Sequence, residues 1–257
     1  MLTAVQLQGI MPGTPAAKRD ALLPFLQAAM REFAIESPAR AAAFLAQLAH
    51  ESGQFRFMEE IWGPTAAQRR YEPASTLAAN LGNSEAGDGL RFKGRGPIQI
   101  TGRANYRRFG DLLGTDLVAQ PERAALPELA FRIAGLFWSK KGLNELADRV
   151  SPDAFREITR RINGGFNGLE DRKKFYATAC SVLGVQELQI TLGTDRGGPG
   201  LVAEPEFERG FEAVRRHSPR RAARKKTTRK ARATSRRKLS APARSSARKR
   251  SRVRKSR

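Results

Sequence analysis

Two glutamates near the end of a predicted helix have the residue type and spacing that acid–base chemistry needs. Glu51 stands beside His50, and Glu60 follows nine residues later, beyond a glycine at position 53. If two carboxyl groups face each other across a cleft, one can donate a proton while the other, ionised, activates water. Hydrolysis of glycosidic bonds uses such a pair. Glutamates at this spacing are also common on solvated surfaces, so the pair alone leaves both interpretations open.

The elements that must position these glutamates are predicted to be helices. Apolar residues at helical spacing predict a helix over 15–34, which either begins near Pro24 or is kinked there. Ser37 followed by Pro38 is an N-cap signature for a second helix, which is expected to end at Gly53. Two later helices are predicted at about residues 127–141 and 169–183, and a third between them opens at Ser151-Pro152 and carries Phe155, Ile158 and Ile162.

The remaining stretches between these helices are rich in turn residues. Residues 54–93 contain Gly-Pro, Gly-Asn and Gly-Asp-Gly sequences and are predicted to be irregular. A second irregular stretch begins at Gly94, with short strand potential at Ile98–Thr101. The fold class is therefore predicted to be mainly α, with a loop-rich polar cleft and little β structure.

Charge divides the chain into two parts. The 257 residues contain 47 Lys and Arg against 25 Asp and Glu, and 21 of the basic residues but no acidic residue fall in 215–257. Residues 1–214 therefore hold 26 basic and 25 acidic residues, which disfavours a uniformly basic nucleic-acid-binding domain. Residues 215–257 are predicted to be a disordered basic tail, and residues 185–214 a linker that could include a short helix.

The sequence offers little for a metal, disulfide or membrane site. The one cysteine, Cys180, excludes an intrachain disulfide, and the two histidines, His50 and His217, are too few for a histidine-based metal site. We therefore expect neither a metal nor a cofactor. The first residues lack a basic start and a long apolar run, so we expect cytoplasmic synthesis without a signal peptide. Action at the cell wall would then require release by lysis or through a holin-type pore.

Five motifs occur in order along residues 3–184. They are Ala49-His50-Glu51-Ser52-Gly53, Glu60-Ile61-Trp62-Gly63-Pro64-Thr65, Gly87-Asp88-Gly89, the stretch from Gly94 to Tyr106, and Ile162-Asn163-Gly164-Gly165. Together they resemble glycoside hydrolase family 19, the chitinase family, and within it the short bacterial and phage branch that includes many endolysins. The resemblance implies a lysozyme-like, mainly α catalytic domain over residues 1–184.

The resemblance also implies an inverting, single-displacement hydrolysis of a β-1,4 bond next to an N-acetylated sugar. Glu51 matches the general acid, and Glu60 matches the general base that activates water. Thr101 matches the hydroxyl residue that helps to hold this water. An inverting pair needs room for that water, with the carboxyl groups about 6.5–9.5 Å apart.

Four further residues are assigned to the site by the same resemblance. Gln99, Asn105 and Asn163 match residues that bind sugar. Their amides suit N-acetyl and hydroxyl groups because each amide offers a donor and an acceptor. Arg172 matches a basic residue that orients the carboxylates, although the loop before it is shorter here than in the family.

Several residues near these motifs have two interpretations. His50 either packs at the helix end or supports Glu51. Arg95 is expected to shape the cleft, with a substrate contact as the alternative. Trp62 and Tyr106 could stack on sugar rings or belong to the core.

The identity of the base also has rivals. Glu59 adjoins Glu60, and Glu72 lies at about the sequence distance at which the longer plant enzymes place their second glutamate. We favour Glu60. Gln54 departs from the family pattern, since a second glycine is common at that position.

Both chitin and peptidoglycan present β-1,4-linked N-acetylated sugars, so the site residues do not separate them. We favour peptidoglycan, as expected for an endolysin of the muramidase type, with a chitinase as the alternative. The basic tail is expected to bind an anionic envelope, either lipopolysaccharide or phospholipid, and it could bind nucleic acid non-specifically. A nucleic-acid-binding protein with a vestigial hydrolase domain is a third hypothesis. The protein is expected to be a monomer.

Overall fold

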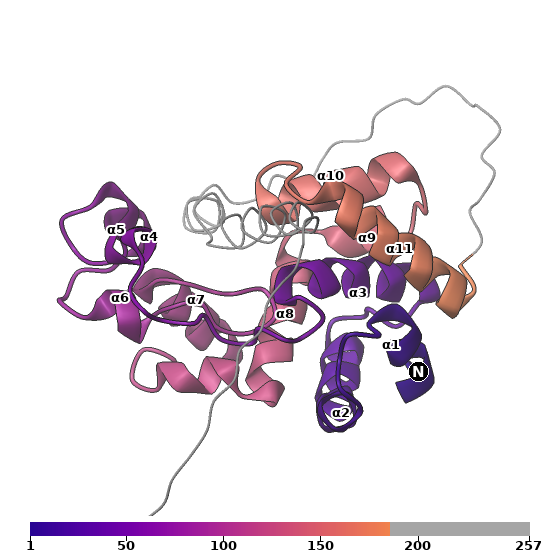
Figure 1. Ribbon diagram of the computed structural model, residues 1–257, viewed down its shortest axis with the longest axis horizontal. Helices are drawn as coiled ribbons and strands as arrows, with labels where there is room; N and C mark the ends of the chain where they lie inside the picture. Colours follow the sequence, from indigo (N-terminus) through magenta and orange to yellow (C-terminus); the bar gives the residue numbers. More distant parts are fainter. Residues whose placement is uncertain (186–257) are drawn as a thin grey trace, which may run out of the picture. The chain divides into compact units, whose positions relative to one another are not determined.

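The computed structural model describes residues 1–185, and Figure 1 shows them as an assembly of helices. The predicted linker beyond Val185 and the predicted basic tail, residues 215–257, lie outside the described residues. The α-helices are α1 Ala4–Ile10, α2 Ala16–Glu32, α3 Pro38–Ser52, α4 Ala66–Arg69, α5 Thr76–Leu81, α6 Asp88–Arg91, α7 Arg103–Leu113, α8 Pro127–Lys140, α9 Leu143–Ala147, α10 Pro152–Asn163 and α11 Leu169–Leu183. A short 3₁₀ helix, η1 Pro121–Ala125, precedes α8. The predicted mainly α fold is confirmed.

Helix α3 lies at the centre of the main body and ends as the sequence predicts. The Ser37 side chain accepts a hydrogen bond from the Arg40 N–H, and Pro38 takes the first helical position. Gly53 then adopts a left-handed conformation, φ 60°, which ends the helix without the steric cost of a Cβ. Because α3 is apolar on almost every side, it is buried, with α11 packed along it (Figure 1).

The helix predicted over 15–34 forms as one element. Helix α2 runs through Pro24 rather than beginning there, and it packs against α8. Proline lacks an N–H, so Pro24 makes no hydrogen bond back to Asp20, and the apolar face of α2 holds the helix in place. In the same core the rings of Phe44 and Trp138 meet edge to face, with their centroids 5.3 Å apart.

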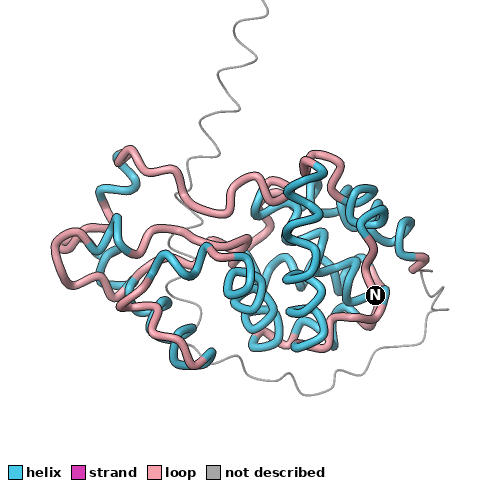
Figure 2. Tube along the Cα trace, turned by 90° about the horizontal axis from the view of Figure 1, so that it is seen from below, coloured by secondary structure: helices cyan, strands magenta, loops and turns pink. Residues whose placement is uncertain are grey.

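The segment predicted to be irregular contains three short helices that were not predicted. Helices α4, α5 and α6 interrupt residues 54–93 and lie at the opposite end of the body from α1 and α2 (Figure 1). Loops dominate this end, as Figure 2 shows. Tyr71, Leu77 and Leu81 form a small core of their own there, with Trp62 packed against it. The turn residues correctly predicted where the chain bends, but helices of four to six residues are too short to show a period.

The predicted strand at Ile98–Thr101 does not form a ladder. Arg95 makes two single antiparallel bridges, one with Glu59 and one with Ile100. Gly96 at φ 75° and Gln99 at φ 58° fold the intervening residues into a tight turn, so no regular strand can extend. The helix that follows, α7, was also missed, because its buried positions include the charged Arg103.

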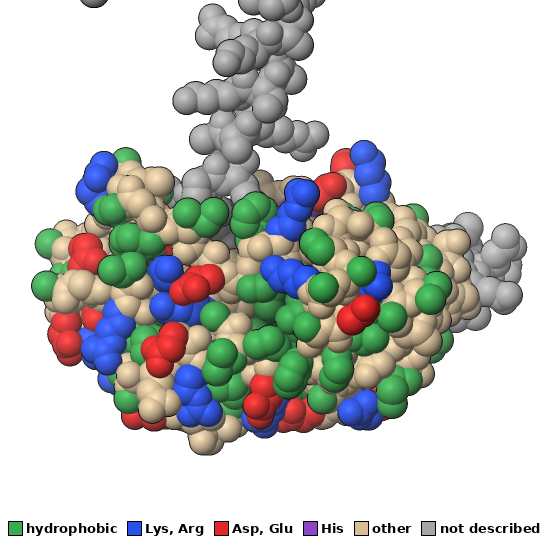
Figure 3. Space-filling model, turned by 60° about the horizontal axis from the view of Figure 1, so that its bottom comes forward, with side chains coloured by type: hydrophobic (Ala, Val, Ile, Leu, Met, Phe, Trp, Pro, Cys, Tyr) green, Lys and Arg blue, Asp and Glu red, His purple; other side chains and the backbone are tan. Residues whose placement is uncertain are grey.

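Within residues 1–185, no helix is long and apolar enough to cross a membrane. On the face of the molecule in Figure 3, Lys and Arg side chains are interspersed with Asp and Glu side chains. This mixed surface agrees with the near balance of charge in residues 1–214.

Candidate active site

Glu51 lies in the last turn of α3 and forms an ion pair with Arg172 in the first turn of α11. The Arg172 Nη2 donates to Glu51 Oε1 at 2.5 Å. Arg172 is 1% exposed, whereas the Glu51 side chain keeps 12% of its surface accessible. The structure therefore brings together two residues that are 121 positions apart in the sequence, and it leaves the carboxyl group in partial contact with solvent.

Arg172 is held by two further acceptors. Its Nη1 donates to the Gln47 Oε1, and its Nε donates to the Asn167 carbonyl oxygen at 3.2 Å. The Gln47 Nε2 in turn donates to the Thr159 hydroxyl at 3.0 Å. Gln47 and Thr159 are not among the site residues predicted from the sequence. A signal for Gln47 was present, since it is a polar residue one helical turn before Glu51 in an otherwise apolar stretch.

His50 sits between the backbone of the loop after α10 and the carboxylate of Asp171. Its Nδ1 lies 2.7 Å from Asp171 Oδ2. Burial lowers the pKa of His50 and the positive charge of Arg172 lowers it further, while the Asp171 hydrogen bond partly opposes both. A Cβ at Gly168 would lie 2.2 Å from the imidazole Cε1, so this ring fits only because residue 168 is glycine. His50 therefore packs at the helix end between Gly168 and Asp171, and its support of Glu51 stays a prediction.

Glu60 lies in the extended segment before α4 and receives its hydrogen bonds from two sides. The Gln68 Nε2 donates to Glu60 Oε1 at 3.0 Å, and the Gly94 N–H donates to Glu60 Oε2, also at 3.0 Å. The Glu60 N–H donates back to the Gly94 carbonyl at 2.8 Å. The buried Tyr71 also makes a side-chain hydrogen bond with Glu60, so three groups hold this carboxyl group in place.

Gly94 also brings Thr101 and Gln99 to the neighbourhood of Glu60. A Cβ at Gly94 would lie 2.7 Å from Gln99 Oε1 and 3.3 Å from Thr101 Oγ1. Thr101 is buried, and its hydroxyl donates to the Gln99 carbonyl at 3.0 Å. The Gln99 amide donates to the Gly96 carbonyl at 2.8 Å. Three of the predicted site residues therefore surround one glycine.

The two predicted asparagines hold backbone turns beside these groups. The Asn105 Nδ2 donates to the Thr101 carbonyl at 2.8 Å and thereby ties α7 to the turn that carries Thr101. The Asn163 Nδ2 lies 3.4 Å from the Asn167 carbonyl, the same oxygen that accepts from Arg172. Asn163 therefore shares an acceptor with Arg172, which pairs with Glu51. Asn105 bonds to Thr101, which lies beside the Gly94 that donates to Glu60.

The rival bases are engaged in other contacts. Glu59, which is half exposed, pairs with Arg95 at 3.0 Å and with Lys93 at 3.3 Å. Arg95 is nearly buried, and its Nη1 donates to the Tyr106 hydroxyl at 2.8 Å. Arg95 therefore shapes the turn from within. Tyr106 is completely buried, so it belongs to the core and does not stack on a sugar.

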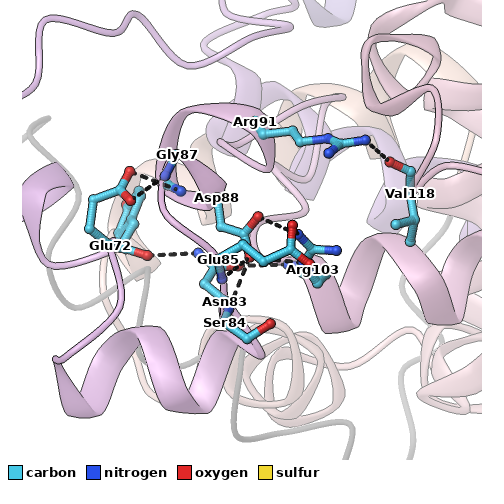
Figure 4. Close-up of polar contacts among 11 residues, drawn as sticks. Glu72, Asn83, Ser84, Glu85, Gly87, Asp88, Arg91, Arg103 and Val118 are labelled. Carbon is cyan, nitrogen blue, oxygen red and sulfur yellow. Dashed lines mark hydrogen bonds and ion pairs between the residues drawn. The ribbon is translucent and has the colours of Figure 1, made fainter.

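Glu72 anchors the loop that leads into α6, as Figure 4 shows. Its carboxylate accepts from the Gly87 N–H at 2.8 Å and from the Gly89 N–H at 3.1 Å. Beside it, Asp88 accepts two hydrogen bonds from Arg103 (Figure 4). Burial alone would raise the pKa of Asp88, but these bonds and backbone donors hold it below its usual range. The Gly-Asp-Gly motif therefore has a structural role here, because its carboxylate and its backbone both hold this loop.

The described residues contain no group of three or more His, Cys, Asp or Glu side chains that could hold a metal ion. What the site does contain is a partly buried glutamate on a helix end, a second glutamate on a loop, and a buried hydroxyl next to the second. General acid–base hydrolysis with water as the nucleophile uses residues of these types.

The comparisons with known proteins agree with this chemistry. Residues 33–190 match the family model for glycoside hydrolase family 19, chitinase class I. A Haemophilus influenzae protein named as containing a glycosyl hydrolase family 19 domain is 38% identical over 158 residues, which cover 52% of this chain and 76% of that protein. An Arabidopsis thaliana endochitinase is 39% identical over 152 residues, which cover 56% of this chain. The chain spans 48% of the length of that plant enzyme.

Solved structures show the same fold. Chitinase C from Streptomyces griseus aligns with a TM-score of 0.56 at 22% identity, covering 72% of this chain and 77% of that one. A class IV chitinase from Zea mays aligns with a TM-score of 0.53 at 25% identity, covering 72% of this chain and 94% of that one. With a family model matched over more than half of its length, the chain belongs to glycoside hydrolase family 19 and is a glycosidase.

Proposed function

We propose that this glycosidase cleaves the β-1,4 bonds of peptidoglycan, as an endolysin of the muramidase type. The observation that carries the proposal is the run of 21 basic and no acidic residues over 215–257, joined to a family 19 domain. Chitin is uncharged, whereas the peptide stems of peptidoglycan bear carboxylates and lie in an anionic envelope. A polycation adds attraction only toward the second kind of target.

In the proposed mechanism Glu51 is the general acid and Glu60 is the general base. Glu51 would protonate the leaving oxygen while Glu60, aided by the Thr101 hydroxyl, takes a proton from the attacking water, with inversion at the anomeric carbon. Two observations support this assignment: Glu51 pairs at the helix end with Arg172, the basic residue that the resemblance places there, and Thr101 lies beside the Gly94 whose N–H donates to Glu60. Gln99, Asn105, Asn163, Arg95 and His50 would shape the sugar site around them.

The test of the mechanism is a matched set of isosteric changes. Glu51→Gln and Glu60→Gln should each lower turnover by at least about a hundredfold with no loss of fold, because each removes a proton-transfer group. Glu59→Gln and Glu72→Gln are the controls and should retain most of the activity. Full activity in Glu51→Gln, or a larger loss in Glu72→Gln than in Glu60→Gln, would refute the assignment. Proton NMR of the first product should detect the α-anomer.

Mass analysis of products decides the substrate. The full chain would be incubated with purified peptidoglycan and, separately, with chitin oligosaccharides. New reducing ends at N-acetylmuramic acid are the expected result. The plant relatives are named endochitinases, which favours chitin as the second candidate. Soluble chitin fragments with no muropeptides would establish that alternative.

The basic segment is proposed to bring the enzyme to its substrate at the cell wall. Its 21 positive charges should bind lipopolysaccharide or anionic phospholipid with a steep dependence on salt. Comparing residues 1–214 with the full chain in binding to lipopolysaccharide, phospholipid vesicles and DNA tests this. Binding of DNA alone by the full chain, without wall cleavage by either form, would instead favour the nucleic-acid hypothesis.

A further inference from the structure

We propose that Gln47 is a positioning residue for Glu51, and that its neutral amide reserves the positive charge of Arg172 for that carboxyl group. This inference rests on the proposed role of Glu51 as the general acid. Gln47 precedes Glu51 by one helical turn on α3, so both side chains leave the same face of the helix. Arg172 reaches both of them from α11.

The chemistry of its neighbours determines how the Gln47 amide is oriented. Arg172 can only donate, so the oxygen of the amide must face it. On the other side, Thr159 uses its own proton in a bond to the Phe155 carbonyl at 3.1 Å. Its hydroxyl oxygen therefore accepts from the amide nitrogen of Gln47 at 3.0 Å. These hydrogen bonds run in one consistent direction, from the guanidinium through the amide and the hydroxyl to the backbone of α10.

Water cannot replace a hydrogen bond that is lost among Gln47, Thr159 and Arg172, because all three residues are buried. Gln47 is 1% exposed, Thr159 is fully buried and Arg172 is 1% exposed. A buried donor without a partner is costly, so each member keeps the next one in place. The hydrogen bonds connect the backbone of α10 to α3 and then to α11, which means that three helices jointly orient the guanidinium toward Glu51.

A neutral acceptor at this place has an electrostatic consequence. The charged and titratable groups around Glu51 include Arg172, His50 and, behind His50, Asp171. A carboxylate at position 47 would compete with Glu51 for Arg172 and add a negative charge beside it. An amide binds Arg172 without either effect.

The experiment compares Gln47→Glu and Gln47→Met in the full chain, with Asn144→Asp as the matched control. Asn144 is also an amide with two partners, since it accepts from Trp138 and donates to the Phe33 carbonyl, but it lies on α9 in a different part of the core. All variants are assayed on the soluble oligosaccharide that the wild type cleaves, over the full pH range.

Gln47→Glu should move the basic limb of the pH–activity profile upward by about one pH unit, because a neighbouring negative charge keeps the general acid protonated to higher pH. Gln47→Met, which removes the acceptor but adds no charge, should lower kcat about tenfold or more with KM changed less than about twofold. Asn144→Asp should lower stability without moving the basic limb. A folded Gln47→Glu variant with an unmoved basic limb would overturn the inference. If that variant does not fold, an unchanged kcat in Gln47→Met would overturn it.

A second readout separates this inference from the proposed function. Carbon NMR of the Glu51 carboxyl group gives its titration directly in the wild type and in Gln47→Glu. If Glu51→Gln remains active, the proposed acid has failed, yet an upward shift of the Glu51 titration still supports the positioning role of Gln47. An unshifted titration overturns that role even where Glu51 is essential.

Discussion

Replacement of Gly168 by alanine should disturb both the stability and the active site of this protein. Gly168 is the N-cap residue of α11, at φ 71°, and a Cβ there would lie 2.2 Å from Cε1 and 2.4 Å from Nε2 of His50. Real Cβ atoms do not approach that closely, so the imidazole must move. Because His50 immediately precedes Glu51, the movement should reach the proposed general acid.

A second glycine provides the control for the backbone alone. Gly114 caps α7 at φ 64°, and a Cβ added there would meet nothing within 4 Å. Gly114→Ala should therefore cost only the left-handed strain of a residue with a Cβ, about 1–2 kcal/mol. Gly168→Ala carries the same strain, about 1–3 kcal/mol for overpacking, and about 0.5 kcal/mol for the disturbed and half-exposed His50–Asp171 bond. The expected totals are about 2.5–5.5 kcal/mol for Gly168 and about 1–2 kcal/mol for Gly114.

Urea unfolding of both variants measures the difference, and turnover on a soluble oligosaccharide measures the effect on the site. We expect Gly168→Ala to have the lower denaturation midpoint and to lose most of its activity, while Gly114→Ala stays active. Equal losses of stability, with full activity in both variants, would show that the His50 ring can move freely and would refute the reasoning.

Three further outcomes are expected. Arg172→Met should destabilise the fold by about 3–5 kcal/mol in urea unfolding, because it removes the arginine that pairs with the partly buried Glu51. Arg40→Met is the control: it breaks the more exposed pair with Asp148 and should cost at most about 1 kcal/mol. Because the pKa of His50 is lowered in the folded state, the unfolded chain binds this proton more readily, so stability should fall as the pH drops below about 6.5. Thermal unfolding of His50→Gln against the wild type checks this, and an equally steep decline in both would contradict it. Residues 1–214 should cleave a soluble, uncharged oligosaccharide as fast as the full chain but bind anionic vesicles less strongly, with less dependence on salt; reduced cleavage would mean that the basic segment acts in catalysis.

Much of the site could be predicted from short-range signals. The N-cap at Ser37 and the glycine at position 53 correctly bound α3, which places Glu51 in its last turn. The turn residues around Gly94 correctly predicted an irregular segment. In the structure the Gly94 N–H of this segment donates to Glu60, and Thr101 lies beside Gly94. These signals are local, because caps and left-handed glycines act within a few residues of the chain.

Other parts of the site depend on residues that only packing brings together. Gln47 looks like one polar residue in an apolar helix until α10 and α11 supply its partners, Thr159 and Arg172. The requirement for glycine at position 168 arises from the ring of His50, which is far away in the sequence. The periodicity of a sequence does not reveal which distant side chain packs against a given residue, as His50 packs against Gly168.

By itself, then, the sequence determined the helical class, the motifs of family 19 and the separation of a nearly neutral domain from a strongly basic segment. Composition and local pattern suffice for these, because they depend on each residue and its near neighbours. The resemblance pointed to Arg172, but only the tertiary structure decided that it bonds to Glu51 and that Gln68, Tyr71 and the Gly94 N–H hold Glu60. The partner of Glu51 follows from the burial of α3 between other helices, and the partners of Glu60 follow from the packing of its loop against Gly94 and α4, since buried polar groups must find partners across the fold.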